Sequence, residues 1–298
     1  MSQDVHADLP TLDQVLSRKT LPPVCLYNFY IVMRDRLKME EILDFYLDLQ
    51  HHELLWRKYV KAMHRTGHLS EEDLSEGYQS PRLLSRLSHS PQQEEAEKIP
   101  SRKELAESAQ RLLLRYLVPS ATKEVTQLPP ELRTSLVKDL QKTEARDDPL
   151  LFAEAKQYTL EYMQRFAYPK FLRLKAWGNV TLYQQLGRLV VGLVCLLAAL
   201  TTSLCFIFLG YPQWSTRFWI LLPFWLGIYN MLVFLTGLDP LWVLVFNKSE
   251  TTTFKFNSIK QPQVKRILVS RSIWQLAQSV IISIICTIIF CAIPPHRL

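Results

Sequence analysis

Among the residues of the types that bind metals or transfer protons, His51-His52 is the only histidine pair, and Glu40-Glu41 is an acidic pair that could do acid–base work. Neighbouring side chains on a helix point about 100° apart. The two histidines therefore do not form a joint metal site, and no second ligand cluster lies near them in the sequence. The two glutamates have the chemistry of an acid–base pair, but they match the solvated first turn of a helix better. We predict no metal site and no acid–base centre.

The cysteines also give little chemistry. None of them forms a C-x-x-C pair, and four of the five lie inside apolar stretches: Cys195, Cys205, Cys286 and Cys291. Buried cysteine behaves as a small hydrophobic residue, so we expect neither a disulfide framework nor a zinc site. The sequence has no glycine-rich phosphate-binding loop and no G-x-S-x-G motif. It predicts a protein that is not an enzyme and needs no cofactor.

The net charge of +7 is best interpreted by its location. A basic chain can bind nucleic acid, but no nucleic-acid-binding motif is present and no such partner is expected. The positive charge instead flanks apolar stretches, where it would face anionic lipid. The N-terminus, MSQDVHADLP, has acids and no apolar core, so we expect no cleavable signal peptide.

Three uncharged runs of 21 residues each dominate the C-terminal part, at 189–209, 218–238 and 273–293. A helix of this length reaches roughly 31 Å, which is the thickness of a bilayer core. The runs therefore predict three transmembrane helices within a membrane region spanning 181–298. Asn230 in the second run has two readings, a transport site or a hydrogen bond between helices. The second is favoured, because no ionisable residue lies in the middle of a run.

The basic residues that flank these runs predict an orientation. The loop between the second and third runs contains Lys248, Lys255, Lys260, Lys265, Arg266 and Arg271. The first loop has only Arg217, and the tail after the third run has only Arg297 and His296. By the positive-inside rule, the N-terminal domain and the second loop face the cytosol. The C-terminus is then expected on the opposite side.

The N-terminal part shows helical signals. A long amphipathic run covers 39–63, and Ser101-Arg102-Lys103-Glu104 is a capping box. Asp148-Pro149 has the pattern of an N-cap followed by proline at the first helical position. Tyr168-Pro169 is expected to break the last long helix.

The stretch 65–100 lacks apolar periodicity and predicts a disordered insert. Its Ser80-Pro81 and Ser90-Pro91 dipeptides are either proline-directed phosphorylation sites or simply exposed serines.

Four segments between Leu9 and Trp177 resemble the regulator of G-protein signalling (RGS) domain, and they occur in the same order as in that family. The segments are TLDQVLSRK, FYIVMRDRLKMEEILDFYLDLQHH, YLVPSATKEVTQLPPELRTSLVKDL and DDPLLFAEAKQYTLEYMQRFAYPKFLRL. A fungal group, the bipolar bud-site-selection proteins and their relatives, joins this domain to C-terminal membrane helices, and the whole chain resembles a member. The resemblance implies an all-α fold, an RGS-like helical bundle followed by three transmembrane helices. The cytosolic domain would comprise 1–64 and 101–180.

The resemblance also implies a site. RGS domains hold the switch regions of a Gα subunit in the transition-state arrangement, where the GTPase's own arginine and glutamine do the chemistry. The candidate Gα-facing surface comprises Glu40, Glu41, Ile42, Thr126, Phe166 and Lys170. Two asparagines of the family pattern fall on Ile42 and Thr126, and an aspartate falls on Phe166. Each replacement removes a polar contact with Gα, at a cost of about 1–3 kcal/mol.

Two functional hypotheses follow from these replacements. The favoured one is a membrane-anchored regulatory or scaffold protein acting in G-protein-linked signalling, cell polarity or bud-site and division-site selection. The alternative is an active GTPase-activating protein (GAP) for Gα. The expected partners are a Gα subunit, other membrane polarity proteins and the lipid bilayer. The expected location is the plasma membrane, with an endomembrane as the alternative.

Overall fold

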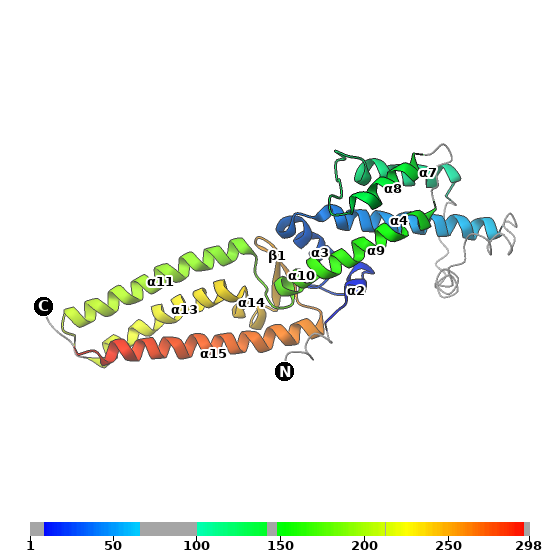
Figure 1. Cartoon of the computed structure of the whole chain (residues 1–298). Coiled ribbons are helices and arrows are strands. Elements are labelled where there is room, and N and C mark those ends of the chain that lie inside the picture. Colours follow the sequence, from blue (N-terminus) through cyan, green and yellow to red (C-terminus); the bar gives the residue numbers. More distant parts are fainter. Residues whose placement is uncertain (1–8, 66–99, 142–147, 212, 295–298) are drawn as a thin grey trace. The chain divides into compact units, whose positions relative to one another are not determined.

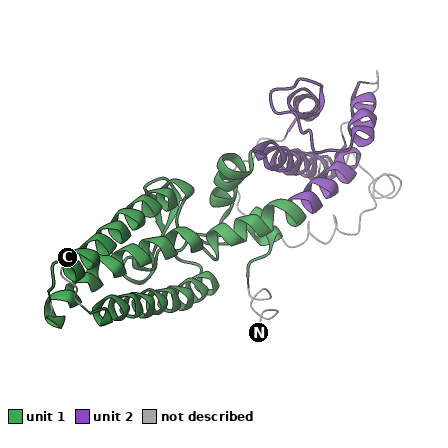
Figure 2. Cartoon of the chain, turned by 60° about the vertical axis from the view of Figure 1, so that its left-hand side comes forward, with its two compact units in different colours: residues 1–38, 164–298 green, residues 39–163 purple. Residues whose placement is uncertain are grey.

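The computed structural model describes residues 9–65, 100–141, 148–211 and 213–294. These residues form two compact units, coloured separately in Figure 2: residues 1–38 with 164–298, called unit 1, and residues 39–163, called unit 2. The described residues are helical apart from one two-stranded hairpin, which confirms the all-α class. The predicted insert and its serines lie almost wholly outside the described residues. The predicted domain boundary near residue 180 stays a prediction.

Unit 2 is a bundle built around one long helix, α4. Its elements are α4 (Glu40–Arg65), α7 (Arg102–Leu112), η2 (Leu113–Leu117), α8 (Pro130–Leu140), η3 (Pro149–Phe152) and α9 (Ala153–Tyr162). The apolar stripe of α4 is buried, and Phe45 packs on Tyr116 of η2 with ring centroids 5.3 Å apart. The long amphipathic helix is therefore confirmed.

The two predicted helix starts in unit 2 are also confirmed. The Ser101 hydroxyl accepts from the N–H of Glu104, and the Glu104 carboxylate accepts from the N–H of Ser101, both at 3.2 Å. The Asp148 carboxylate accepts from the N–H of Leu151 at 3.0 Å and opens η3, a short 3-10 turn that leads into α9. Side-chain caps at these positions satisfy backbone donors that the first helical turn leaves unpaired.

The N-terminal helices of unit 1 pack around one aromatic cluster. They are α2 (Leu12–Leu16), α3 (Leu26–Val32) and η1 (Met33–Leu37), and α10 (Tyr168–Lys175) joins them. Phe29 is fully buried against Phe171, with ring centroids 5.1 Å apart, and against Tyr168 at 6.3 Å. These edge-on contacts between rings fix α10 against α3.

The predicted break at Tyr168-Pro169 coincides with the start of a separate helix, α10, although no non-helical gap precedes it. Residues 153–175 stay helical, passing from α9 through the π-helical turn η4 (Met163–Ala167) into α10. Pro169 lies in the first turn of α10, where the missing backbone N–H has no intrahelical acceptor to lose.

Three helices of unit 1 are long and apolar enough to cross a membrane (Figure 1). They are α11 (Leu182–Phe208), the stretch α12 (Trp214–Arg217), η5 (Phe218–Ile220) and α13 (Leu221–Thr236), and α15 (Pro262–Ala292). The first and third begin earlier than the predicted 189 and 273, because the polar residues before each apolar run are helical too. A short helix, α14 (Pro240–Leu244), follows α13.

Small residues let α11 and α13 approach closely. A Cβ atom on Gly227 would lie 2.7 Å from a side-chain carbon of Leu196, and one on Gly192 would lie 3.2 Å from the carbonyl oxygen of Gly227. Both distances are shorter than ordinary contacts, so only glycine fits without a shift. A separate buried apolar cluster joins α11 and α13 to α15, and it includes Ala199, Phe224 and Cys291.

The strands β1 (Lys248–Thr252) and β2 (Lys255–Ser258) form an antiparallel hairpin that sequence analysis missed. Their sequences, KSETT and KFNS, are short and polar and carry no strong strand signal. The hairpin is nevertheless tied into unit 1. The N–H of Glu250 donates to the carbonyl of Asn179 at 2.8 Å, and the hairpin's Phe256 stacks on Trp242 with centroids 4.3 Å apart.

Candidate functional site

The start of α4 carries three of the residues expected to face Gα. Glu40 and Glu41 are half-buried in its first turn. Ile42 is only 1% exposed, so the expectation that it faces Gα is corrected. Its place in the helix gives the reason. Ile42 is the first member of the apolar stripe that continues through Phe45 and Leu49, and this stripe faces the core.

Thr126 is exposed on a turn that the structure holds firmly. The backbone N–H groups of Lys123 and Val125 donate to the carbonyls of Arg115 and Tyr116 at 3.2 and 3.1 Å. These bonds close the turn onto η2. The turn therefore presents Thr126 in a fixed position rather than on a loose loop.

Ion pairs attach the same turn to its neighbours. Lys123 pairs with Asp44, which lies one helical turn after Glu40, and Glu124 pairs with Arg133 of α8. Both pairs are partly buried, so solvent screens them less than exposed pairs. The turn that carries Thr126 thus lies beside the first turns of α4, which brings these predicted site residues together within unit 2.

Phe166 and Lys170 belong to unit 1. Phe166 is 53% exposed in η4, and Lys170 is exposed in α10. The two residues are four apart along one helical stretch, so this stretch exposes both an aromatic ring and a cation. A large exposed aromatic side chain of this kind is typical of an interaction surface.

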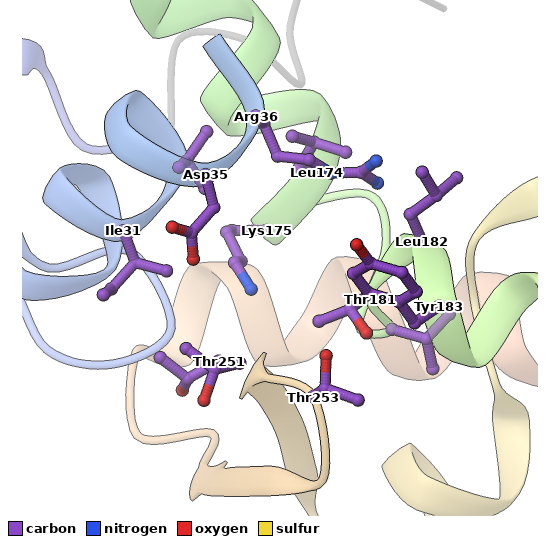
Figure 3. Close-up of a pocket in the computed structure, with 13 residues that line it drawn as sticks. Ile31, Asp35, Arg36, Leu174, Lys175, Thr181, Leu182, Tyr183, Thr251 and Thr253 are labelled. Atoms are coloured by element: carbon purple, nitrogen blue, oxygen red, sulfur yellow. The ribbon is translucent and has the colours of Figure 1, made fainter. Parts of the chain in front are cut away.

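Unit 1 contains a pocket of about 320 Å³ that no sequence pattern predicted (Figure 3). It is lined by residues of α3 and η1, of α10, of the segment that leads into α11, and of the hairpin. Lys175 lies in this pocket, is only 5% exposed, and donates to the carbonyl of Glu250 at 2.6 Å. The pKa of Lys175 is lowered to about 8, mainly by burial; nearby Arg36 also lowers it, and Glu250 opposes the shift. No motif in the sequence marks Lys175 as a pocket residue.

A second polar cluster joins α11 to α13. Arg188 of α11 donates to the side-chain oxygen of Asn230 of α13 at 3.1 Å and pairs with the buried carboxylate of Asp239. The expected role of Asn230 in a hydrogen bond between helices is confirmed. Within the described ranges, no group of three or more His, Cys, Asp or Glu side chains is placed to hold a metal ion.

Comparison with known proteins identifies the larger part of this arrangement. Residues 26–179 match the regulator of G protein signaling domain, RGS, over more than half of the chain. The chain is also 29% identical to the protein rax1 of Schizosaccharomyces pombe, over an alignment of 348 residues that covers 98% of this chain and 100% of that protein. No solved structure matches the chain. On the strength of the domain match, the chain belongs to the family of proteins with a regulator of G protein signaling domain.

Proposed function

We propose that the protein is a regulatory scaffold inserted in a membrane, which presents its RGS domain to a Gα subunit and to other polarity proteins without strongly accelerating GTP hydrolysis. A regulatory role follows from the RGS domain. The similarity to rax1 extends over the apolar helices as well as the RGS domain, which supports a role that needs both parts. The membrane in question is proposed to be the plasma membrane.

Membrane insertion is supported by the surface of the three apolar helices. Large side chains such as Leu197, Trp219 and Leu235 are 63%, 70% and 70% exposed, and the helices share this character along their length. A monomer in water rarely exposes contiguous apolar surface of this extent. The hydrocarbon of a bilayer would cover it.

Hydrogen bonds support the proposed sidedness. The N–H groups of Lys260 and Gln261, which lie between the second and third apolar helices, donate to the carbonyl of Pro22 at 2.9 and 3.1 Å. Segments that share such bonds must lie on one side of a bilayer. The basic residues of the second loop favour the cytosol for both.

The site favours binding over catalysis. Only interactions that strengthen in the transition state accelerate hydrolysis. Thr126 and Phe166 are the exposed residues at positions where the family pattern has polar contacts with Gα. Phe166 carries this proposal, because an exposed phenyl ring supports apolar association but cannot hydrogen-bond a Gα switch region. The alternative, an active GAP, would have to rely on Glu40, Glu41 and Thr126.

The test is single-turnover GTP hydrolysis by fungal Gα subunits, with the full chain in lipid nanodiscs. We expect stimulation below about tenfold, which corresponds to about 1.4 kcal/mol of barrier. Binding to Gα should persist and should weaken in Phe166→Ala. Lys61→Ala, an exposed change elsewhere on α4, is the matched control. Stimulation of about a hundredfold that is lost in Thr126→Ala or Phe166→Ala would establish the GAP alternative and overturn the scaffold.

A further inference from the structure

The pocket of unit 1 carries positive charge that its own carboxylate does not neutralise. Arg36 and Lys175 both line it, and they are close enough to repel each other. Asp35 also lines it, but Arg34 holds that carboxylate at 2.7 and 3.3 Å and keeps the pKa of Asp35 low. Among the described residues, Arg36 has no hydrogen-bond or ion-pair partner. Two cations placed together in this way favour an anion between them.

The nearest other carboxylate, that of Glu250, is already engaged. Its oxygens accept from the backbone N–H groups of Thr181 at 2.6 Å and Phe254 at 2.7 Å. Glu250 therefore fixes the hairpin against the start of α11. It partly offsets the charge of Lys175 but does not line the pocket.

Two hydroxyl groups of the pocket have no hydrogen-bond partner. Thr251 is 6% exposed, and its Oγ1 is buried without a donor or acceptor nearby. The Oγ1 of Thr181 is in the same state. An unpaired buried hydroxyl is unfavourable, so each of these threonines has hydrogen-bonding capacity that the folded chain leaves unused. Figure 3 shows Arg36, Lys175, Thr181 and Thr251 around one space.

The pocket also lies at the N-terminus of α11, a helix of 27 residues. Thr181 is the N-cap residue but makes no side-chain capping bond. The first N–H groups of a helix have no intrahelical acceptor and carry about half a positive charge in sum. Phosphate groups bind readily at such helix ends, and here the helix end adds to two cations and two unpaired hydroxyls.

The pocket volume of about 320 Å³ is at the small end for ligand sites and suits a headgroup without its acyl chains. Apolar Leu174, Val180 and Leu182 line one part of it. The acyl chains would continue along the apolar surface of α11. We propose that this pocket binds the phosphate headgroup of an anionic membrane lipid. The inference rests on the membrane insertion proposed above.

The same phosphate chemistry would suit a soluble phosphate compound, so the test uses three probes. The full chain, purified in a nonionic detergent, is titrated with short-chain phosphatidic acid, short-chain phosphatidylcholine and glycerol 3-phosphate, and binding is followed by native mass spectrometry. We expect phosphatidic acid to bind at least about tenfold more tightly than either other probe. Equal binding of phosphatidylcholine would overturn selectivity for an anionic headgroup. Equal binding of glycerol 3-phosphate would overturn the lipid as the source.

Variants locate the site. Arg36→Gln and Thr251→Val should each weaken binding of phosphatidic acid by about tenfold, whereas Lys170→Gln on exposed α10 surface should leave it unchanged. Unchanged affinity in Arg36→Gln would overturn the proposal. Arg36 is half-exposed, so this variant decides the matter even where Thr251→Val fails to fold. Flotation with liposomes tests membrane insertion separately. If the chain floats with liposomes but does not bind phosphatidic acid, the proposed lipid site is refuted and membrane insertion is not.

Discussion

Arg188 of α11 forms an ion pair with Asp239, the N-cap residue of α14, whose side chain is completely buried. The other oxygen of that carboxylate accepts from the hydroxyl of Tyr229 at 2.5 Å and from the N–H of Leu241 at 3.1 Å. Asn179 brackets the backbone of the same residue, accepting from its N–H at 2.6 Å and donating to its carbonyl at 3.1 Å. One buried charge therefore joins α11, α13, α14 and the segment before α11.

Removing the guanidinium should destabilise unit 1 strongly. Arg188→Met leaves the Asp239 carboxylate buried without its cation, and breaking such a pair costs about 3–5 kcal/mol. We expect a large fall in the thermal unfolding midpoint of the detergent-solubilised chain. The double variant Arg188→Met with Asp239→Asn should recover part of the loss, because no charge then remains buried. Arg266→Met, an exposed change on α15, is the control; equal midpoints for Arg188→Met and Arg266→Met would contradict this account.

The close approach of α11 and α13 gives a second prediction. Gly227→Ala places a methyl group 2.7 Å from Leu196, so the helices must separate. We expect a loss of about 1–3 kcal/mol, as for other overpacked cores. Gly187→Ala has open space around its Cβ and should be neutral, or stabilising by about 1 kcal/mol through helix propensity. Thermal unfolding of both variants in one detergent makes the comparison, and a destabilised Gly187→Ala with a stable Gly227→Ala would refute it.

The lowered pKa of Lys175 predicts that the free energy of unfolding rises with pH. Its pKa is about 8 in the folded chain, against about 10.4 when unfolded. Between these values the unfolded chain binds more protons, so the free energy of unfolding increases with pH, by on the order of 3 kcal/mol at most. The charged groups that act on Lys175 are Glu250, Arg36 and Cys25. In Lys175→Met this increase should vanish, while Lys170→Met should keep it. Denaturant titrations from pH 7.5 to about 10.5 compare the slopes, and identical slopes in wild type and Lys175→Met would rule the effect out.

The proposed sidedness predicts the pattern of N-glycosylation. The sequons at Asn179 and Asn247 lie on the proposed cytosolic side and should stay unmodified. Asn179 is in addition 1% exposed. An acceptor tag appended after Leu298 should be modified, since we propose that the C-terminus lies on the opposite side. Mass shifts on glycosidase treatment report whether a sequon is modified. A shift that disappears in Asn247→Gln would show that the second loop lies on the side opposite to the one proposed.

Much of the fold could be predicted from the sequence because the signals were local. The apolar runs, the capping box at Ser101 and the N-cap at Asp148 each specify a helix within a few residues. The π-turn η4, which joins α9 to α10 without a gap, was not predicted, because no residue pattern in the sequence marks it. The hairpin was missed because its stability comes from Asn179 and Trp242, which lie outside it.

The site was less predictable than the fold. The family pattern located the turn with Thr126, but it placed Ile42 on a surface, whereas the helical stripe of α4 buries it. The pocket around Lys175 assembles residues from three distant parts of the sequence. No spacing in the sequence shows such a juxtaposition. The same holds for Arg217, which is buried and donates to the carbonyls of Cys291 and Ile293 at the end of α15.

The bonds from Lys260 and Gln261 to the carbonyl of Pro22 have a consequence for biosynthesis. The ribosome delivers Pro22 early and its partners only near the end of translation. At about 5–20 residues per second, the delay is on the order of ten seconds to a minute. Throughout that interval the carbonyl of Pro22 lacks these two donors, so the segment between α2 and α3 completes its hydrogen bonding only after Lys260 and Gln261 emerge. Chains that terminate before Lys260 would therefore never complete this N-terminal segment. We expect the cell to degrade such chains rather than to use them as shortened regulators.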